Sequence, residues 1–228
     1  MFEFHNVTKI YKNKFTAVKD INLKIEKGSF SFVVGKSGAG KTTLIKLLIK
    51  EVNPTEGTIF FNGEDITYLS SRRIPLHRRK VGVVFQDFRL LNKKTVYENI
   101  AFAMEMVGQS PKSIRREVPN VLSMVGLSDK ATNFPNELAG GEQQRIAIAR
   151  AVVNRPDLII ADEPTGNLDP ETSNEIMKIF SEINRRGTTL LMVTHDRTIV
   201  DMMKKRVIEL KNGRIIRDTE EGDYYEGF

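Results

Sequence analysis

The stretch that decides the fold is Gly35-Lys36-Ser37-Gly38-Ala39-Gly40-Lys41-Thr42, followed directly by Thr43. Its pattern, G-x-x-x-x-G-K-T, is that of a phosphate-binding loop. The apolar run at residues 30–34 predicts a buried strand before the loop, and residues 43–49 predict a helix after it. Because the motif requires both flanks, a chance glycine turn is the weaker interpretation.

The residue types in this loop suit a nucleoside triphosphate and its Mg²⁺ ion. Glycine lets the backbone turn its N–H groups toward phosphate oxygens, and the new helix adds the positive end of its dipole. Lys41 supplies a mobile cation for the outer phosphates, and the Thr42 hydroxyl is a ligand for Mg²⁺. We therefore expect residues 35–43 to bind ATP, with Lys41 also serving catalysis.

Composition limits the class of protein. The chain has 228 residues and no cysteine, so it has no disulfide framework and no thiolate metal site. The start of the chain lacks a signal-peptide pattern, and no apolar run approaches the ~18 residues of a spanning helix. These features predict a cytoplasmic protein that meets the membrane only through a partner.

The formal net charge of +6 indicates a nucleic-acid partner or an anionic membrane surface, and the plainer alternative is a basic proteome or a surface that faces lipid head groups. Basic residues cluster at residues 72–80 and 204–206. Neither cluster is interleaved with aromatic residues, as it would be in a protein that binds single strands. The sequence therefore does not favour direct nucleic-acid binding.

Residues 1–86 alternate between predicted strands and helices, with a hairpin turn at Asn62-Gly63. Residues 87–154 predict helices only. One of these helices begins after Ser110 with Pro111 at its first position, and Pro119 inside it should kink or interrupt it. The predicted strands in the first part lie at residues 2–11, 18–25, 30–34, 58–61 and 81–85.

Residues 155–219 return to alternating strands and helices. Residues 220–228 form an acidic tail that we expect to be frayed. The whole order predicts an α/β core at 1–86 and 155–219, with a helical subdomain inserted at 87–154. The predicted elements of the third part are strands at 158–161 and 188–194, helices at 171–184 and 197–204, and a hairpin across Asn212-Gly213.

Two carboxylates, Asp162 and Glu163, follow the predicted buried strand at 158–161. Asp162 can hold the water shell of Mg²⁺, and Glu163 can polarise a water molecule for attack on the γ-phosphate. Taken alone, solvated acids at a strand end would explain the pair equally well. Together with the phosphate loop, the pair predicts a metal role for Asp162 and a catalytic role for Glu163.

The most specific string is Leu138-Ala139-Gly140-Gly141-Glu142-Gln143-Gln144-Arg145, which resembles the signature of ABC-type ATPases, usually L-S-G-G-Q. The resemblance covers nearly the whole chain and implies a P-loop NTPase fold with an antiparallel β subdomain and an inserted helical subdomain. It implies that Ala139, Gly140, Gly141 and Glu142 contact the ATP held by a second chain. ATP would then lie at two composite sites of a head-to-tail homodimer.

The resemblance assigns four further residues, three of which have a plainer alternative. Tyr11 resembles the aromatic residue that stacks on adenine, although it could be an ordinary aromatic of an edge strand. Gln86 resembles the glutamine that binds Mg²⁺ and leads into the helical insertion, or it is a simple loop amide. Asp169, in Gly166-Asn167-Leu168-Asp169, resembles the loop that crosses to the second subunit. His195 resembles the catalytic switch histidine at the γ-phosphate, or it is a core histidine.

One residue departs from the family pattern. Alanine stands at position 139, where the family has a serine whose hydroxyl donates to the γ-phosphate across the dimer. A hydrogen bond to a charged group contributes ~1.5–3 kcal/mol. We therefore expect ATP-driven dimerisation to be weaker than with serine.

The stretch Asp162-Glu163-Pro164-Thr165-Gly166-Asn167-Leu168-Asp169 resembles the subgroup of lipoprotein-release, macrolide-export and cell-division ATPases. Residues 93–105 and 135–145 look closest to the FtsE group of cell-division ATPases. That resemblance implies an FtsX-like integral membrane partner, a place on the inner face of the membrane and an indirect action on peptidoglycan hydrolases. The alternatives are the ATPase of a lipoprotein or macrolide exporter and a soluble clamp on nucleic acid.

Residues 88–91, Phe88-Arg89-Leu90-Leu91, follow Gln86 and are mostly apolar. We expect them to be exposed and to form part of the groove that receives a cytoplasmic helix of the partner. The alternative is that they belong to the core of the helical subdomain.

Overall fold

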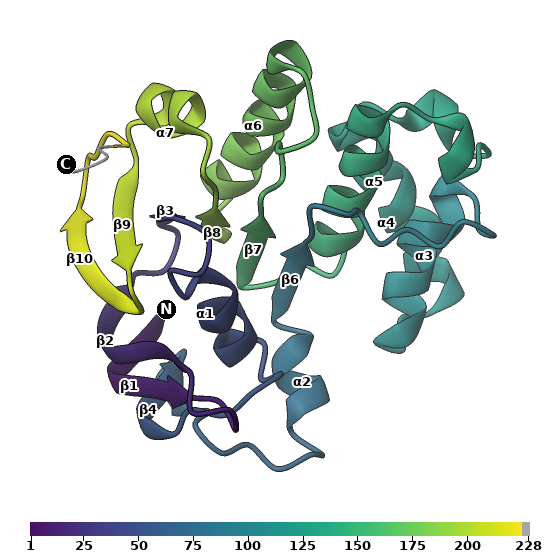
Figure 1. The fold of residues 1–228 in the computed structure, drawn as a ribbon. Coiled ribbons are helices and arrows are strands. Elements are labelled where there is room, and N and C mark those ends of the chain that lie inside the picture. The colour runs from purple at the N-terminus through teal and green to yellow at the C-terminus, as the bar shows by residue number, and fades with distance from the viewer. Residues whose placement is uncertain (225–228) are drawn as a thin grey trace. The chain divides into compact units, whose positions relative to one another are not determined.

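The computed structural model describes residues 1–224. The chain forms two compact units, which we call the N/C unit and the middle unit (Figure 1). Among the described residues, the N/C unit comprises Met1–Arg78 and residues 189–224, and the middle unit is Arg79–Thr188. The subdomain boundaries expected from the sequence, 87–154 within a core, stay a prediction.

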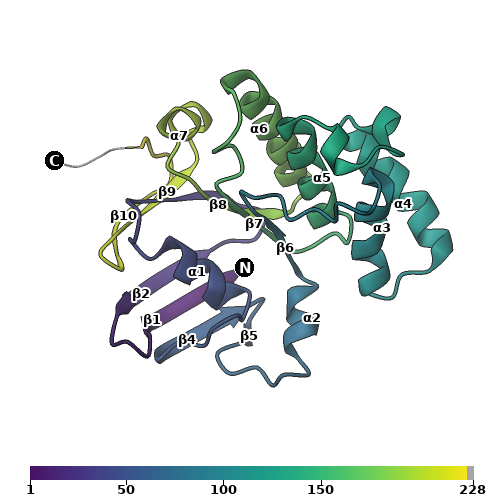
Figure 2. The same cartoon turned by 45° about the vertical axis from the view of Figure 1, so that its right-hand side comes forward.

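An antiparallel sheet forms one layer of the N/C unit, and helix α1 (Lys41–Leu48) lies against it (Figure 2). Alternate residues of its strands are buried, which is the pattern expected of a sheet with one face in the core. The Asn62-Gly63 turn has positive φ at both residues, 51° and 78°, so it is the predicted two-residue hairpin turn. The strands, in sheet order, are β2 (Thr16–Ile25), β1 (Phe2–Ile10), β4 (Glu56–Phe61) and β5 (Glu64–Asp65).

A second group of strands in this unit surrounds β3 (Phe30–Val34), all of whose residues are buried. Strand β3 pairs in parallel with β8 (Thr189–Val193) on one side and with β9 (Arg206–Lys211) on the other. Continuous burial of β3 and β8 explains their unbroken apolar sequences. The remaining elements of the unit are β10 (Arg214–Thr219), which pairs with β9, and helices α2 (Ile74–Arg78) and α7 (Arg197–Met203).

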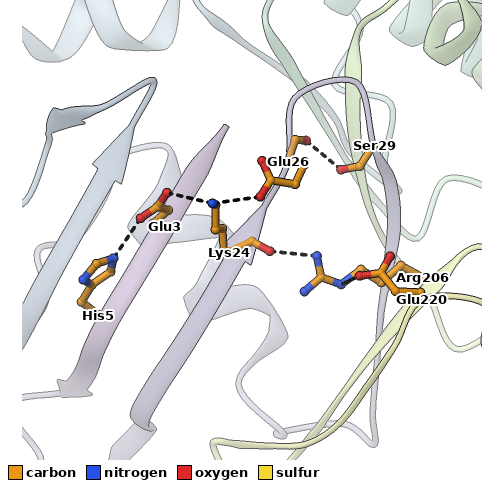
Figure 3. A network of polar contacts seen from close by, with 7 residues as sticks. All are labelled: Glu3, His5, Lys24, Glu26, Ser29, Arg206 and Glu220. Atoms are coloured by element: carbon orange, nitrogen blue, oxygen red, sulfur yellow. Dashed lines mark hydrogen bonds and ion pairs between the residues drawn. The ribbon is translucent and has the colours of Figure 1, made fainter.

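A chain of polar contacts joins the outer strand of the antiparallel sheet to β9 (Figure 3). Lys24 Nζ lies 3.0 Å from Glu26 and 3.9 Å from Glu3, and Arg206 donates to the Lys24 carbonyl over 2.8 Å. The Arg206 guanidinium also pairs with Asp218, which raises its pKa. The Lys24 pairs are exposed and contribute little stability. The half-buried Arg206 fixes the β9 end of the network.

The middle unit holds two parallel strands, β6 (Val81–Val84) and β7 (Leu158–Asp162), and between them the chain forms only helices and turns. Helix α5 contacts α3, α4 and α6 (Figure 1). Buried apolar residues of α3, α4 and α5 form one cluster. The helices are α3 (Val96–Met106), α4 (Pro111–Met124), α5 (Gly140–Val152) and α6 (Pro170–Arg185), with short 3₁₀ turns at Ser128–Lys130 and Pro135–Glu137.

Most predicted elements are confirmed with shifts of one or two residues at their ends. Ser110 caps α4 as predicted, accepting a hydrogen bond from Ser113 N. The expected interruption at Pro119 is wrong, because α4 runs through it to Met124. Pro119 is exposed, so water can satisfy the carbonyl that loses its partner, while the buried Val118 and Leu122 hold the helix in place.

The expectation of a frayed tail is wrong for residues 220–224, while residues 225–228 lie outside the described residues. Tyr224 is only 8% exposed, and its N–H donates to Asp201 over 2.5 Å. Lys204 pairs with Asp223, and Gly222 N donates to the Lys205 carbonyl. An aromatic anchor and these contacts outweigh the repulsion among the acidic residues.

None of the helices in residues 1–224 is long and apolar enough to cross a membrane.

Two glycines of the antiparallel sheet provide a matched test of packing. Both have positive φ, 83° at Gly57 and 78° at Gly63. A Cβ at Gly57 would collide with the Asn6 carbonyl and lie 2.5 Å from His5 O, whereas one at Gly63 would meet nothing within 4 Å. We expect Gly63→Ala to lower the free energy of unfolding by ~1–2 kcal/mol, the cost of left-handed backbone. Gly57→Ala should cost at least twice as much in urea unfolding, and equal costs would contradict the described close approach of β1 and β4.

Candidate phosphate-binding and catalytic site

The predicted phosphate loop connects β3 to α1 in the N/C unit. Its glycines at 35, 38 and 40 have φ values of 143°, 78° and 109°, which other residues rarely adopt. A Cβ at Gly40 would lie 2.7 Å from the Ala17 carbonyl, so no side chain fits there. Lys41 Nζ donates to the carbonyls of Gly35, over 2.5 Å, and Lys36, over 3.2 Å. The loop therefore holds its own lysine beside the backbone that would surround a phosphate.

Three further side chains of the N/C unit belong to this region. Tyr11 Oη lies 3.4 Å from Thr43 Oγ1, which places the tyrosine beside the first turn of α1. The Thr42 side chain is exposed and Thr43 is buried. His195 is exposed two residues after the end of β8, and β8 is a parallel neighbour of β3. Because parallel strands end at the same edge of a sheet, the loop and His195 lie at one edge.

In the middle unit, the predicted carboxylates and glutamine follow neighbouring strands. Asp162 is the last residue of β7, and Gln86 follows β6, which pairs in parallel with β7. A Cβ at Gly166 would lie 3.2 Å from Gln86 Nε2, so the glutamine reaches the turn after Glu163. Glu163 itself has a φ of 48°, and its carbonyl accepts a hydrogen bond from Gly166 N. The structure thus brings Gln86, Asp162 and Glu163 to one edge of the unit.

The signature residues form the N-terminus of α5. Ala139 is the N-cap, and Gly140 and Gly141 are the first two residues of the helix. Glu142 folds back so that its carboxylate accepts a hydrogen bond from Ala139 N over 2.9 Å. No side chain bonds the first free N–H groups of the helix, because alanine has no acceptor. These amides and the helix dipole can therefore take a phosphate.

The other predicted loop residue, Asp169, caps α6. Its carboxylate accepts hydrogen bonds from Thr172 N, over 2.9 Å, and from Thr172 Oγ1, over 2.6 Å. These bonds hold the pKa of Asp169 below its ordinary value. A Cβ at Gly141 would collide with the Thr172 methyl group, so the signature loop packs directly on this cap. The sequence prediction missed Thr172, although a threonine three residues after an N-cap aspartate is a recognisable capping pattern.

The helix caps distinguish two helix N-termini from the rest. Among the α-helices of seven or more residues within residues 1–224, those with side-chain caps are α3, α4, α6 and α7. Helices α1 and α5 have no side-chain cap, and their N-cap residues are Gly40 and Ala139. These are the helices at which the sequence places phosphate. A triphosphate therefore fits the donor groups that the fold leaves open.

The segment after Gln86 is held by two polar side chains that the sequence prediction missed. Arg150 of α5 donates to the carbonyls of Phe88, over 2.8 Å, and Arg89, over 2.6 Å. Both carbonyls belong to residues with positive φ, and burial lowers the pKa of Arg150. Asn99, 0% exposed, accepts from Leu91 N and donates to Leu91 O. Asn99 lies between Val96 and Ile100 on the apolar face of α3, and this position could have indicated a buried, hydrogen-bonded side chain.

The expected exposure of residues 88–91 is only partly right. Arg89 is exposed, and its guanidinium lies over the Phe85 ring at 3.6 Å. Phe88, Leu90 and Leu91 are half-buried, and Leu90 packs against the helical core cluster. The segment is thus shared between the core and the surface.

Residues 18–166 match the family model described as ABC transporter. The chain belongs to the ABC transporter family. It is an ATPase of that family with the family's α/β fold, as its motifs predict.

The similar proteins include three that carry the name cell division ATP-binding protein FtsE. The Bacillus subtilis protein is 53% identical over 98% of both chains. The Mycobacterium tuberculosis protein is also 53% identical, again over 98% of both chains. The Escherichia coli protein is 46% identical over 94% of this chain and 97% of its own.

Solved structures of ABC cassettes share the fold. The dimeric cassette MJ0796, in a post-hydrolysis state bound to ADP and Pi, has a TM-score of 0.87 at 34% identity, covering 98% of this chain and all of its own. CbiO1 of Clostridium perfringens, part of the cbiONQ transporter complex, has a TM-score of 0.90 at 31% identity, over 96% of this chain and 88% of its own.

The hydrogen bonds from Arg150 to the segment at residues 88–91 yield a direct prediction. Arg150→Met removes two charge-assisted hydrogen bonds, worth ~1.5–3 kcal/mol each. Amide hydrogen exchange at residues 87–91 should therefore accelerate by about tenfold or more. Arg116→Met, which removes an exposed arginine of α4, is the control and should leave this segment unchanged. Unchanged protection in Arg150→Met would mean that the arginine does not hold the segment.

Proposed function

We propose that this chain is the ATP-hydrolysing subunit of a cell-division membrane complex with an FtsX-like integral membrane partner. The observation that carries the proposal is a sequence identity of 46–53% to proteins named FtsE over nearly the full length. The nucleotide-site motifs also follow one another along this chain in the family's order. The protein then lies in the cytoplasm on the inner face of the membrane, bound through its partner. Peptidoglycan hydrolases are its indirect targets across the membrane.

Each site residue has a proposed role. Residues 35–43 and Lys41 hold the phosphates, and Tyr11 stacks on the adenine. Thr42, Gln86 and Asp162 are the residues that would hold Mg²⁺, and the ion would neutralise charge on the phosphate oxygens. Glu163 is the general base for the attacking water, and His195 contacts the γ-phosphate.

Hydrolysis requires two chains in this scheme. The open N-terminus of α5, with Ala139–Glu142, faces the triphosphate on the other chain's loop, and Asp169 crosses near it. The dimeric ABC cassettes among the similar structures support this arrangement. Residues 88–91, held by Arg150 and Asn99, are the proposed contact for the membrane partner.

Purification from membranes tests the partner assignment. The proposal expects one integral membrane protein of the FtsX type to co-purify with this chain. Deletion of the gene for that protein should remove this chain from the membrane fraction. Recovery of an exporter permease would instead support the transport alternative. Recovery of nucleic acid alone would support the clamp alternative.

We expect Mg²⁺-dependent ATP turnover per chain to rise with protein concentration, because each site needs residues from two chains. Lys41→Ala should abolish turnover. Lys46→Ala changes a surface lysine on the same helix, paired with Glu51, and should retain it. A steady-state phosphate-release assay over a range of protein concentrations reads both results. Turnover independent of concentration in a demonstrated monomer would refute the two-chain site.

Position 139 allows capping and phosphate binding to be separated. Ala139→Ser and Ala139→Asp should each raise the free energy of unfolding by ~1 kcal/mol, because both supply the side-chain acceptor that the N-cap of α5 lacks. Only the serine hydroxyl can also donate to a phosphate. With ATP, in a Glu163→Gln background that slows hydrolysis, Ala139→Ser should strengthen dimerisation by about tenfold per site. The aspartate should weaken it through charge repulsion.

Sedimentation with ATP gives the dimer dissociation constants for this comparison, and thermal unfolding without ATP gives the stabilities. If serine and aspartate change dimerisation alike, position 139 does not face a phosphate of the other chain.

A further inference from the structure

One buried hydrogen bond joins the signature helix to the turn that carries Glu163. Gln144, in the second turn of α5, is 0% exposed, and its Nε2 donates to the Pro164 carbonyl over 2.8 Å. Pro164 directly follows Glu163 and is itself buried. The proposed catalytic base, Glu163, is therefore one residue away from a backbone carbonyl that is hydrogen-bonded to α5.

Of the two polar atoms of the Gln144 side chain, only the nitrogen can donate to a carbonyl, so this bond determines the orientation of the amide. Its Oε1 is buried and has no hydrogen-bond partner among the described residues. A buried acceptor without a partner is unfavourable, and an apolar residue of similar size would avoid that loss. Glutamine at this position is thus poor for packing alone, and its remaining contribution is the bond to Pro164.

A second contact ties the same segment to α5. A Cβ at Gly140 would lie 3.5 Å from Leu168 Cδ2, and one at Gly141 would collide with Thr172. Thr172 in turn holds Asp169 through two hydrogen bonds. Residues 163–172 are therefore attached to α5 at its N-terminus and again one turn later.

We propose that Gln144 is a positioning residue that sets the orientation of Glu163 according to the position of α5. The proposal rests on the proposed function, in which the N-terminus of α5 binds the triphosphate held by the other chain. When that phosphate fixes the position of α5, the Gln144–Pro164 bond transmits this position to the left-handed turn at Glu163. The Glu163 carboxylate of one chain then becomes correctly oriented only after the signature residues of the same chain have bound the triphosphate of the other chain.

The test compares Gln144→Met with Asn154→Leu. Asn154, just after α5, also donates one amide hydrogen bond to a backbone carbonyl, that of Ala103 over 2.8 Å. Its Oδ1 is also buried and has no partner within residues 1–224. The two variants lose the same type of interaction, but only the first touches the Glu163 turn. We expect Gln144→Met to lower kcat by about tenfold with KM for ATP changed less than about twofold. Asn154→Leu should leave kcat within about twofold.

A double-mutant cycle identifies the route. If Gln144 acts through Glu163, then Gln144→Met should lower the residual turnover of Glu163→Gln by less than about twofold. ATP-driven dimerisation in the Glu163→Gln background should be unchanged by Gln144→Met. Gln144→Asn, which keeps the amide but is one methylene shorter, should reproduce the loss of kcat and serves if the methionine variant does not fold.

The outcomes separate the two proposals. Wild-type turnover in Glu163→Gln alone would refute the proposed catalytic base. Slow turnover in Glu163→Gln combined with equal kcat in Gln144→Met and Asn154→Leu would refute the role of Gln144 and leave the base in place. Weakened dimerisation or a raised KM in Gln144→Met would also overturn it, because the glutamine would then act on binding.

Discussion

A helix N-terminus can bind a phosphate only if its own chain leaves the first amides free. Among the α-helices of seven or more residues within residues 1–224, two begin without a side-chain cap and the other four have one. Helices α3, α4, α6 and α7 are capped by Thr95, Ser110, Asp169 and Asp196, while α1 and α5 begin after a glycine and an alanine. The open helices lie in different units, α1 in the N/C unit and α5 in the middle unit. The positions of free amides therefore determine where a triphosphate can be held.

Helix α5 connects the parts of the middle unit that are proposed to act on ATP. Its N-terminus carries the signature, its second turn reaches Pro164 through Gln144, and its last turn holds the carbonyls of residues 88 and 89 through Arg150. Each of these bonds ends on backbone rather than on another side chain. A displacement of α5 is therefore transmitted to main-chain atoms beside Glu163 and beside Gln86, without passing through flexible side-chain pairs.

The sequence predicts the parts of the fold that local rules control. Periodicity locates β3 and β8, the glycine pattern locates the loop before α1, and Ser110 locates the start of α4. It fails where distant contacts decide the outcome. Pro119 breaks a local rule, yet α4 continues because its buried face is anchored, and the acidic tail is held by Tyr224. Motifs identify the predicted site residues, whereas Gln144 and Arg150 gain their roles from carbonyls far along the chain.

Several locally unfavourable features lie at the residues assigned to ATP. Glu163 has a left-handed backbone, as do Phe88 and Arg89 next to Gln86. The helices α1 and α5 lack caps, and Gln144 keeps a buried oxygen without a partner among the described residues. Each feature costs on the order of 1 kcal/mol or more. The buried apolar cluster of α3, α4 and α5 offsets some of them, and continuous burial of β3 offsets others. Left-handed residues and unpartnered buried atoms also occur elsewhere among the described residues, at Lys50 and Asn154 for example, so neither feature alone marks a site. The distinguishing feature is the pair of open helix N-termini. Among the α-helices of seven or more residues within residues 1–224, α1 and α5 are the two without a side-chain cap, and both begin at predicted phosphate-binding motifs.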